Sequence, residues 1–459
     1  EFKKMTEKDY AGLPLRIRDL STLKLDNAYV KQELIGKSAD RFCIENLSCR
    51  YKKAYSCLLN KLSFSASVGE IVGIVGRNGC GKTTLLKYMA IIMNPGKANV
   101  FRYGDDAKVW VDYKDVDKMI RIGLGEGWVE KGKNYRKASH HMWKAPEKDE
   151  TISESYSVND LEKNNIKFAP LILGAYRRIA YKEIEGMKKE ALPVQRRNDY
   201  RSRAIEGIEG GYLPDVKQWM INRYFEIEKE WAHNYKDNWN WIISNLNTIS
   251  PYGEAFKFKE IKKDLEPIFI LNDKECYLEE LSAGFQAILS LIFAIVEWIE
   301  AVNEEEDILI QQAEGTVFID ELDVHLHPEW QIIIRNMLDK VFPRLQFVIT
   351  THSPHLIASA QAGEIIKIPS GENEIDIKAN SKSYSGWSTD EILEDVMEVK
   401  NLENKEYNLI LKKTMDFILA KDVDNIKICI EQLEKIVHPN NTIVNEMKIK
   451  LAELILEDE

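Results

Sequence analysis

The sequence predicts an α/β fold built on a parallel sheet, because the order strand, loop, helix occurs twice. Near the start, a β-branched run at 70–75 leads through a glycine-rich turn into a helical pattern at 84–93. Late in the chain, strand patterns at 316–319 and 346–350 flank a helical pattern at 327–341. Neighbouring parallel strands need a long crossover, usually a helix, so this alternation indicates one parallel sheet assembled from both ends of the chain.

Hydrophobic periodicity predicts the remaining elements. Alternating apolar and polar residues predict strands at 41–47 and 62–66. Aromatic residues in 210–249 recur at spacings near three, four and seven, which predicts an amphipathic helical arm whose rings pack in a core rather than stack on bases. The apolar run 287–298 predicts a buried helix and is too short to cross a bilayer. The chain after 389 is helical by period.

Composition describes a globular protein rather than a disordered, collagenous or disulfide-rich one. Of the 459 residues, 44% are apolar and 30% charged, and this length suggests about two to four domains. The net charge of -11 argues against a uniformly basic coat for nucleic acid. Most of the acidity lies in 388–459, where 9 Lys stand against 17 Asp and Glu. Six cysteines without a CxxC pair favour a reducing, cytoplasmic location.

A phosphate-binding loop follows the strand pattern at 70–75. It fits G-x-x-x-x-G-K-[ST] and lies directly before a helix, which is the context that this motif requires. The glycines let backbone N–H groups surround phosphate oxygens, the lysine reaches the β and γ phosphates, and the hydroxyl after it binds Mg²⁺. The residues predicted to hold ATP are Gly76, Arg77, Asn78, Gly79, Cys80, Gly81, Lys82, Thr83 and Thr84, with Thr83 also a Mg²⁺ ligand.

Two carboxylates end the strand pattern at 316–319. A phosphate loop alone hydrolyses nothing, so the site needs one carboxylate to hold the metal and another to activate water. Asp320 is placed to hold Mg²⁺ through water, while Glu321 points elsewhere and is the candidate general base. An acidic pair at a strand end is commonly just a polar terminus, but the phosphate loop in the same chain favours the catalytic interpretation.

Two further segments define the subclass. Leu281–Gln286 opens the apolar helix, so Ser282 can cap that helix and leave N–H groups free for an anion. This LSAGFQ run resembles the LSxGxQ signature of ABC-type ATPases, which implies that Ser282 and Gly284 of one protomer close on the γ-phosphate held by another. His352 follows a strand, as does the switch histidine of the same superfamily, and the resemblance implies contact with the γ-phosphate and the attacking water.

The adenine contact and one metal ligand are harder to place. Tyr51 lies 25 residues before Gly76, where ABC-type proteins commonly place an aromatic ring that stacks on adenine. Tyr55 and an ordinary strand tyrosine are the alternatives. No glutamine occurs between Thr83 and Gln195, so the Q-loop glutamine of ABC-type enzymes has no counterpart at its usual position.

Longer motifs narrow the resemblance. The pattern D-E-x-x-x-x-L-H-P at 320–328 with T-H-S-P at 351–354 resembles the RecF, SMC and overcoming-lysogenisation-defect (OLD) ATPases. Residues 174–178, the aromatic arm and 384–393 are similar to the PtuA-like ATPases of Septu anti-phage systems and their retron-associated relatives. The resemblance implies an ABC/SMC-type P-loop head with a large, mainly helical insertion and a C-terminal helical module. The predicted parts are an N-terminal lobe at 1–110, the insertion at 111–275, a C-terminal lobe at 276–388 and an acidic helical tail at 389–459.

The same resemblance implies an ATPase that uses ATP and Mg²⁺, forms a homodimer or higher oligomer around ATP, and controls a partner HNH nuclease. DNA, or a retron reverse transcriptase with its RNA and DNA, is a further candidate partner, and no membrane is expected. The acidic tail is either a module that binds a partner or dimerises, or a solvated helical surface.

Two other functions compete with this interpretation. A RecF/SMC-like repair ATPase would bind DNA directly. The basic runs at 131–144 and 177–203 can bind phosphates, although such runs are more often solvated basic loops. An ABC transporter subunit is disfavoured, because 200 residues separate Lys82 from Ser282, about twice the usual spacing in that family.

Overall fold

The computed structural model divides the chain into two compact units, 1–397 and 398–459. The described residues are 15–18, 27–35, 38–49, 59–67, 69–93, 108–115, 118–124, 127–131, 138–157, 160–164, 166–210, 212–303, 308–368, 380–381, 383–399, 405–439 and 441–458.

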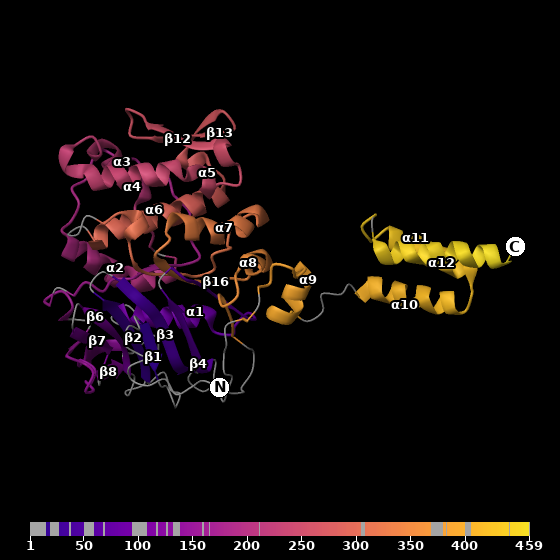
Figure 1. Ribbon diagram of the computed structural model, residues 1–459, viewed down its shortest axis with the longest axis horizontal. Coiled ribbons are helices and arrows are strands. Elements are labelled where there is room, and N and C mark those ends of the chain that lie inside the picture. Colours follow the sequence, from indigo (N-terminus) through magenta and orange to yellow (C-terminus); the bar gives the residue numbers. More distant parts are fainter. Residues whose placement is uncertain are drawn as a thin grey trace. The chain divides into compact units, whose positions relative to one another are not determined.

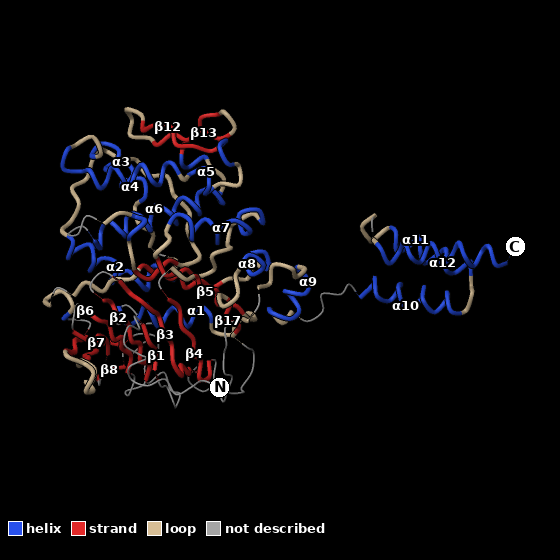
Figure 2. The backbone as a smooth tube through the Cα atoms, in the orientation of Figure 1, coloured by secondary structure: helices blue, strands red, loops and turns tan. Residues whose placement is uncertain are grey.

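A five-stranded parallel sheet forms the centre of the first unit and confirms the predicted fold class (Figures 1 and 2). Its strand order is β11-β15-β16-β5-β17. The strands are β5 (Ile71–Val75), β11 (Leu171–Leu173), β15 (Gly315–Ile319), β16 (Leu345–Thr350) and β17 (Ile365–Lys367). Because both ends of the chain supply neighbouring strands, the segments that follow β5, β15 and β16 meet at one edge of the sheet.

The edge strand β11 comes from the predicted insertion. It pairs in parallel with β15, with Leu171 opposite Val317 and Leu173 opposite Ile319. All three of its residues are buried. The insertion is therefore part of the ATPase sheet itself, and it reaches the end of the strand that carries the acidic pair.

A second, seven-stranded sheet has the order β10-β7-β6-β2-β1-β3-β4, and β8 pairs with β9 in a separate antiparallel hairpin. The strands predicted at 41–47 and 62–66 are confirmed within β3 and β4. The sheet combines strands from both sides of position 110, where the N-terminal lobe was predicted to end. The strands are β1 (Leu15–Arg18), β2 (Asn27–Ile35), β3 (Ser38–Cys49), β4 (Leu59–Ser67), β6 (Lys108–Asp115), β7 (Lys118–Leu124), β8 (Gly127–Lys131), β9 (Ala138–Trp143) and β10 (Glu154–Ser157).

Helices and a small three-stranded sheet pack beyond the parallel sheet (Figure 1). The predicted aromatic arm consists of three helices, α3, α4 and α5, and its rings pack mainly in the core. Trp219 and Trp239 are both 4% exposed and lie 5.9 Å apart between ring centroids, whereas Trp231 is 65% exposed. The elements are α2 (Pro193–Ile208), α3 (Val216–Glu226), a 3₁₀ turn (Glu230–Ala232), α4 (His233–Ser244), α5 (Leu246–Ile249), a 3₁₀ turn (Gly253–Ala255), β12 (Phe256–Ile261), β13 (Pro267–Leu271), β14 (Lys274–Tyr277) and a 3₁₀ turn (Leu278–Glu280).

The central helix α6 (Ala283–Asn303) joins this layer to the sheet. It extends the predicted run 287–298 in both directions, so the expectation that it is too short to cross a bilayer was wrong on length alone. Among the described residues it is the one helix long and apolar enough for a membrane span, but 89% of its apolar window is buried inside the protein, as in a core helix. A buried ion pair fixes it to α3, since the Arg223 Nε lies 2.6 Å from a Glu300 oxygen.

The remaining helical elements of the first unit follow α6 in the chain. The segment 384–393, one of those that carried the family resemblance, lies here, and Ile392 and Val396 pack against Val75 at the end of β5. The elements are a 3₁₀ turn (Ile310–Gln312), α7 (Pro328–Val341), α8 (Pro354–Ser359), α9 (Thr389–Glu391) and a π-helix (Ile392–Val396).

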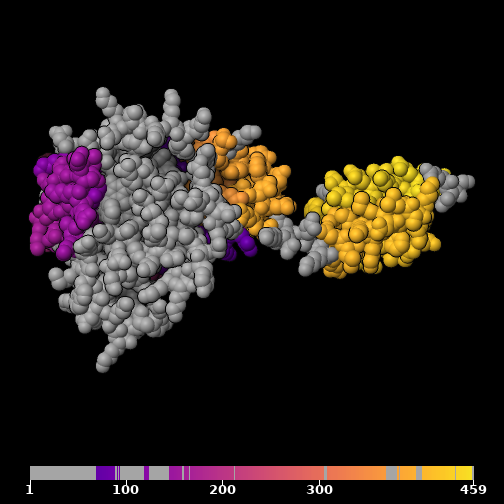
Figure 3. Space-filling model, turned by 90° about the horizontal axis from the view of Figure 1, so that it is seen from below, coloured from indigo at the N-terminus to yellow at the C-terminus, as the bar shows by residue number. Residues whose placement is uncertain are grey.

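The second unit is a helical module, as the periodicity after 389 predicts. Its helices are α10 (Lys405–Leu419), α11 (Val423–Glu434) and α12 (Thr442–Asp458), and Figure 3 shows them in yellow as one continuous surface. Ile426, Ile430, Leu433 and Val444 form its buried core. Asp422 accepts a hydrogen bond from the N–H of Asn425 at 3.2 Å and caps α11.

Candidate nucleotide site

The phosphate loop connects β5 to α1 (Lys82–Met93), in the predicted order of strand, loop and helix. Gly76 has φ +148°, and a Cβ atom there would lie 2.4 Å from the carbonyl oxygen of Ile368. Only glycine fits such an approach. The loop residues 77–79 are exposed, while Cys80 and Gly81 are buried beneath them and Thr84 is half-buried in the first turn of α1. The N–H groups at the start of α1 are thus available to an anion.

Lys82 is held across the loop rather than extended into solvent. Its side chain is 5% exposed, and its ammonium donates to the carbonyl oxygens of Gly76 at 2.7 Å and Arg77 at 3.2 Å. Burial lowers the pKa of Lys82, and the nearby Cys80, Asp320 and Glu321 oppose that shift. Within the described residues this ammonium forms no ion pair, so its charge is not neutralised by a carboxylate in contact with it.

Asp320 and Thr83 meet, although 237 positions separate them in the chain. The Thr83 hydroxyl donates to Asp320 Oδ1 at 3.1 Å, and the Thr350 hydroxyl donates to the same oxygen at 2.6 Å. Asp320 is 3% exposed and follows the last residue of β15. The predicted pair of Mg²⁺ ligands therefore forms one cluster of oxygen atoms, the donor type that Mg²⁺ prefers.

Glu321 occupies a conformation unusual for a residue with a side chain. Its φ is +48°, and its backbone N–H donates to the Thr350 hydroxyl at 2.7 Å. Burial raises the pKa of Glu321, and the negative charges of Asp320 and Asp323 act in the same direction. Strained backbone in non-glycine residues is concentrated at functional sites. The distinct roles of Asp320 and Glu321 stay a prediction.

Asp323 positions the switch histidine, a link that the sequence reasoning missed. Its Oδ1 accepts from the Thr351 hydroxyl at 2.5 Å and from the backbone N–H of His352 at 3.0 Å. Burial lowers the pKa of His352, and the Lys82 ammonium lowers it further. A neutral imidazole can both donate and accept a proton, which is the property the predicted role needs.

Arg177 is the second residue whose role was missed. It is 2% exposed, and its guanidinium donates to the carbonyl oxygens of Gly174 at 2.5 Å, Asp320 at 3.0 Å and Glu321 at 2.8 Å. Burial lowers the pKa of Arg177 to about 10, so the side chain stays charged at neutral pH. The sequence singled out Gly174–Arg178 only through its resemblance to a known family. The role of Arg177 was not predicted, because its partners are backbone carbonyl groups and no side-chain pattern reveals them.

The signature segment lies apart from these groups. Ser282 is exposed at the start of α6, where its carbonyl accepts from the N–H of Gln286 at 2.9 Å. A Cβ atom on Gly284 would lie 3.3 Å from the carbonyl oxygen of His325, in the turn after the acidic pair. Across the described residues, no hydrogen bond joins Ser282 or Gly284 to the phosphate loop of the same chain. Tyr51 and its rival Tyr55 lie outside the described residues.

The parallel sheet, the phosphate loop and the acidic strand end together define a P-loop ATPase. Residues 59–185 match the family model described as "ABC transporter", and residues 214–357 match the one described as "AAA ATPase domain". Both matches extend into the predicted insertion at 111–275, and residues 186–213 lie between them. One contains the phosphate loop, and the other contains the acidic pair and the residues predicted as the signature and the switch histidine.

The chain is similar to a Septu PtuA protein and to retron ATPases, as predicted. It is 25% identical to "Septu protein PtuA" of Bacillus thuringiensis, over 86% of this chain and 94% of that protein. It is 24% identical to "Retron Ec83 probable ATPase" of Escherichia coli over 62% of this chain, and spans about half (51%) of that protein. It is 23% identical to "Retron Vc95 probable ATPase" of Vibrio cholerae over 81% of this chain and 79% of that protein.

Solved structures also match at low similarity. One is the SmcHead bound to the C-winged helix domain of ScpA, at 12% identity and a TM-score of 0.34 over 72% of this chain and 95% of that one. Another is a putative metal-chelate type ABC transporter in an inward-facing conformation, at 13% identity and a TM-score of 0.33 over 79% of this chain and 93% of that one. The fold assignment rests on the order of the parallel sheet.

Proposed function

We propose that this chain is the ATPase subunit of a bacterial anti-phage defence system, that two copies close around ATP, and that the closed state controls a partner HNH nuclease. The similarity to Septu and retron ATPases supports the biological setting. The observation that carries the dimer is the exposed position of Ser282, which has no hydrogen bond to the phosphate loop of its own chain in the part that the structure describes. A second copy would supply its signature segment to the nucleotide bound at the phosphate loop of the first copy.

The groups at the strand ends suit ATP hydrolysis. Lys82 would bind the β and γ phosphates, since it is a buried ammonium without an ion pair. Thr83 and Asp320 would hold Mg²⁺, which when bound neutralises phosphate charge and orients the phosphates. Glu321 would take a proton from the attacking water, while His352 would hydrogen bond to that water and to the γ-phosphate.

The acidic tail is the part we assign to partner binding or self-association. Its helices form their own core, yet six apolar side chains among its described residues are more than half exposed. Exposed apolar groups on a small helical module are typical of an interaction surface. The six are Leu409, Met415, Leu419, Ile428, Ile449 and Leu456.

The test of the site and the dimer is Glu321→Gln. We expect ATP turnover to fall by about 10²–10⁴-fold, the usual contribution of a general base, while ATP binding is kept. Light scattering with ATP and Mg²⁺ should then show a stable dimer of the variant. Glu329→Gln, an exposed neighbour at the start of α7, is the matched control. Unchanged turnover in Glu321→Gln would remove Glu321 from its role, and a monomer with ATP bound would contradict the dimer.

The test of the tail is removal of 398–459, which leaves α9 and the π-helix in the first unit. We expect ATP turnover to persist while a co-expressed HNH nuclease no longer copurifies. Copurification at the wild-type level would show that the nuclease contacts the ATPase unit instead.

Direct DNA binding, as in RecF/SMC-like repair ATPases, is a second candidate because the basic run 131–144 falls largely on the β8–β9 hairpin. In its register Lys131 is opposite Ala138, while His140 and His141 are opposite Glu130 and Val129. DNA affinity of the isolated protein that falls steeply with salt would favour this function. The absence of DNA binding at low salt would exclude it.

A further inference from the structure

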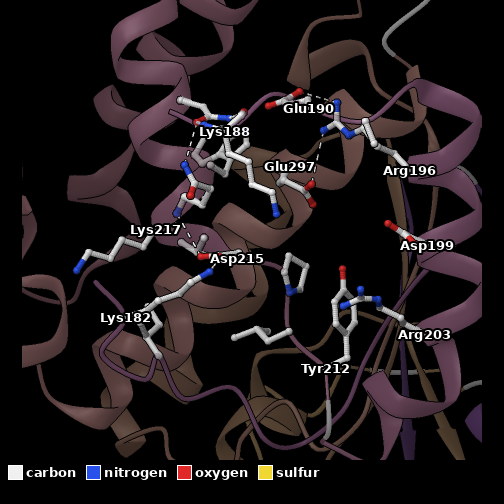
Figure 4. Close-up of a pocket in the computed structure, with 18 of the residues that line it drawn as sticks. Lys182, Lys188, Glu190, Arg196, Asp199, Arg203, Tyr212, Asp215, Lys217 and Glu297 are labelled. Carbon is white, nitrogen blue, oxygen red and sulfur yellow. Dashed lines mark hydrogen bonds and ion pairs between the residues drawn. The ribbon is translucent and has the colours of Figure 1, made fainter. Parts of the chain in front are cut away.

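The basic stretch 177–203 encloses a cavity that the nucleotide site does not use. The cavity has a volume of about 600 Å³ and lies between the segment 178–191, the helices α2 and α3, and the turn 212–215. Figure 4 shows Glu190, Arg196 and Glu297 at one end of it and Arg203 and Tyr212 at the other. Small-molecule sites typically enclose about 300–1,000 Å³, so the space suits a ligand of nucleotide size.

The charges of the cavity favour an anion. Seven basic and four acidic residues line it. Three of the acidic groups already have partners, since Asp215 pairs with Lys182, Glu190 lies 2.8 Å from Arg196, and Glu297 lies 3.5 Å from Arg196.

Several of the basic groups are available. Arg178, Lys188 and Lys189 are exposed and have no ion pair with any residue that the structure describes. Arg203 lies over the ring of Tyr212, 4.8 Å from its centroid. Unpaired cations in excess of carboxylates favour binding of a phosphate group. An aromatic ring beside a guanidinium favours binding of a planar base.

The cavity wall is fixed to the strand next to the acidic pair. A Cβ atom on Gly174 would lie 2.3 Å from the carbonyl oxygen of Gly207, and one on Gly207 would lie 2.5 Å from that of Ile172. These approaches lock α2 against β11. Arg178 also follows Arg177 directly, and Arg177 holds the carbonyl groups of Asp320 and Glu321.

We propose that this cavity binds a phosphate-bearing small molecule of nucleotide size, at a site separate from the phosphate loop. The basic stretch is then a wall of a ligand site rather than a solvated loop. The proposal does not depend on the partner nuclease or on dimerisation.

The experiment measures binding of AMP, GMP and inorganic phosphate to the full chain by equilibrium dialysis. Wild-type protein is compared with Lys82→Ala, with Lys188→Glu/Lys189→Glu and with Lys257→Glu/Lys263→Glu. The last pair is the matched control, because both lysines are exposed and lie outside the cavity. We expect binding to persist in Lys82→Ala and in the control, and to weaken by about ten-fold or more in the Lys188/Lys189 variant, since two cations become anions.

Three results would overturn the proposal. Loss of binding in Lys82→Ala would assign the ligand to the phosphate loop. Full binding in Lys188→Glu/Lys189→Glu would remove the cavity from consideration. Binding of a single-stranded oligonucleotide but of no mononucleotide or phosphate would make the surface a nucleic-acid contact instead.

Discussion

The phosphate loop and the insertion cavity are two places where this protein gathers cations, and they are built in opposite ways. The loop is one run of eight residues whose lysine bonds only to backbone carbonyl oxygens and one thiol. The cavity takes its charges from separate elements, and three of its cations are already paired with carboxylates. A contiguous motif can be read from sequence, whereas a dispersed set of charges becomes a site only after folding.

The largest expected difference between the two places is in ATP turnover. Lys82→Ala removes the loop ammonium, so we expect turnover to fall by about 10²-fold or more, as for loss of a preorganised charge at a reacting group. Lys188→Glu/Lys189→Glu should keep its basal turnover within about two-fold, since surface substitutions away from a site usually change little. Steady-state phosphate release measures both. Similar losses in the two variants would show that the cavity belongs to the catalytic site.

The next largest expected effect is on the free energy of unfolding, at Trp219, which lines the cavity. Trp219 is buried and donates its indole N–H to Glu300 at 2.8 Å. We expect Trp219→Ala to lower the free energy of unfolding by about 3–5 kcal/mol, as for other large core truncations. Trp231→Ala, at an exposed position, should change it by less than about 0.5 kcal/mol. Urea unfolding measures this contrast, and equal effects would place Trp231 in the core as well.

Replacing Arg177 tests whether the segment that leads into the insertion cavity also positions the strand end of the nucleotide site. Replacing it with Ala leaves buried carbonyl groups without a donor, so we expect a loss of about 3 kcal/mol in stability and a fall in turnover. Arg178→Ala is the control, because its side chain is exposed and unpaired in the described structure. Thermal unfolding and phosphate release are measured on both. Normal turnover in a folded Arg177→Ala variant would show that its hydrogen bonds do not position Glu321.

The smallest effect concerns pH. Burial raises the pKa of Glu297 to about 7. The folded state then holds a proton that the unfolded state releases near the ordinary value for Glu. Its stabilising contribution is full below that ordinary pKa and is lost as pH rises through about 7. Glu297→Gln cannot ionise, so its Tm relative to wild type should rise by about 2 °C or more between pH 5 and pH 8. A constant Tm difference would mean that Glu297 stays ionised throughout.

The parts of the site that could be predicted are those carried by side-chain motifs and strand ends. Residues 76–83 and the pair Asp320 and Glu321 are recognisable because their chemistry lies within a few positions of one another. The role of Arg177 could not be predicted, because its partners are carbonyl groups brought close by the pairing of β11 with β15. Asp323 was missed for the same reason, since its contacts to Thr351 and His352 join segments 28 and 29 positions apart.

The elements of the fold differ in the same way in how well the sequence predicts them. Short runs such as 70–75 and 346–350 are predicted because parallel strands are apolar throughout. The three-residue strand β11 is too short to produce a period, and only the sheet reveals it. The aromatic spacing predicted a helical arm at 210–249, but it did not reveal the turn at Glu230–Ala232 that divides the arm.

The measurement that tests the central claim most directly is ATP turnover in a mixture of two inactive variants. Lys82→Ala damages the phosphate loop and Ser282→Arg blocks the exposed signature. In a dimer that pairs the loop of one copy with the signature of the other, one variant of each kind leaves one intact site. We therefore predict that each variant alone is nearly inactive and that the mixture regains turnover well above their sum. A mixture no more active than its components would contradict a site shared between two copies.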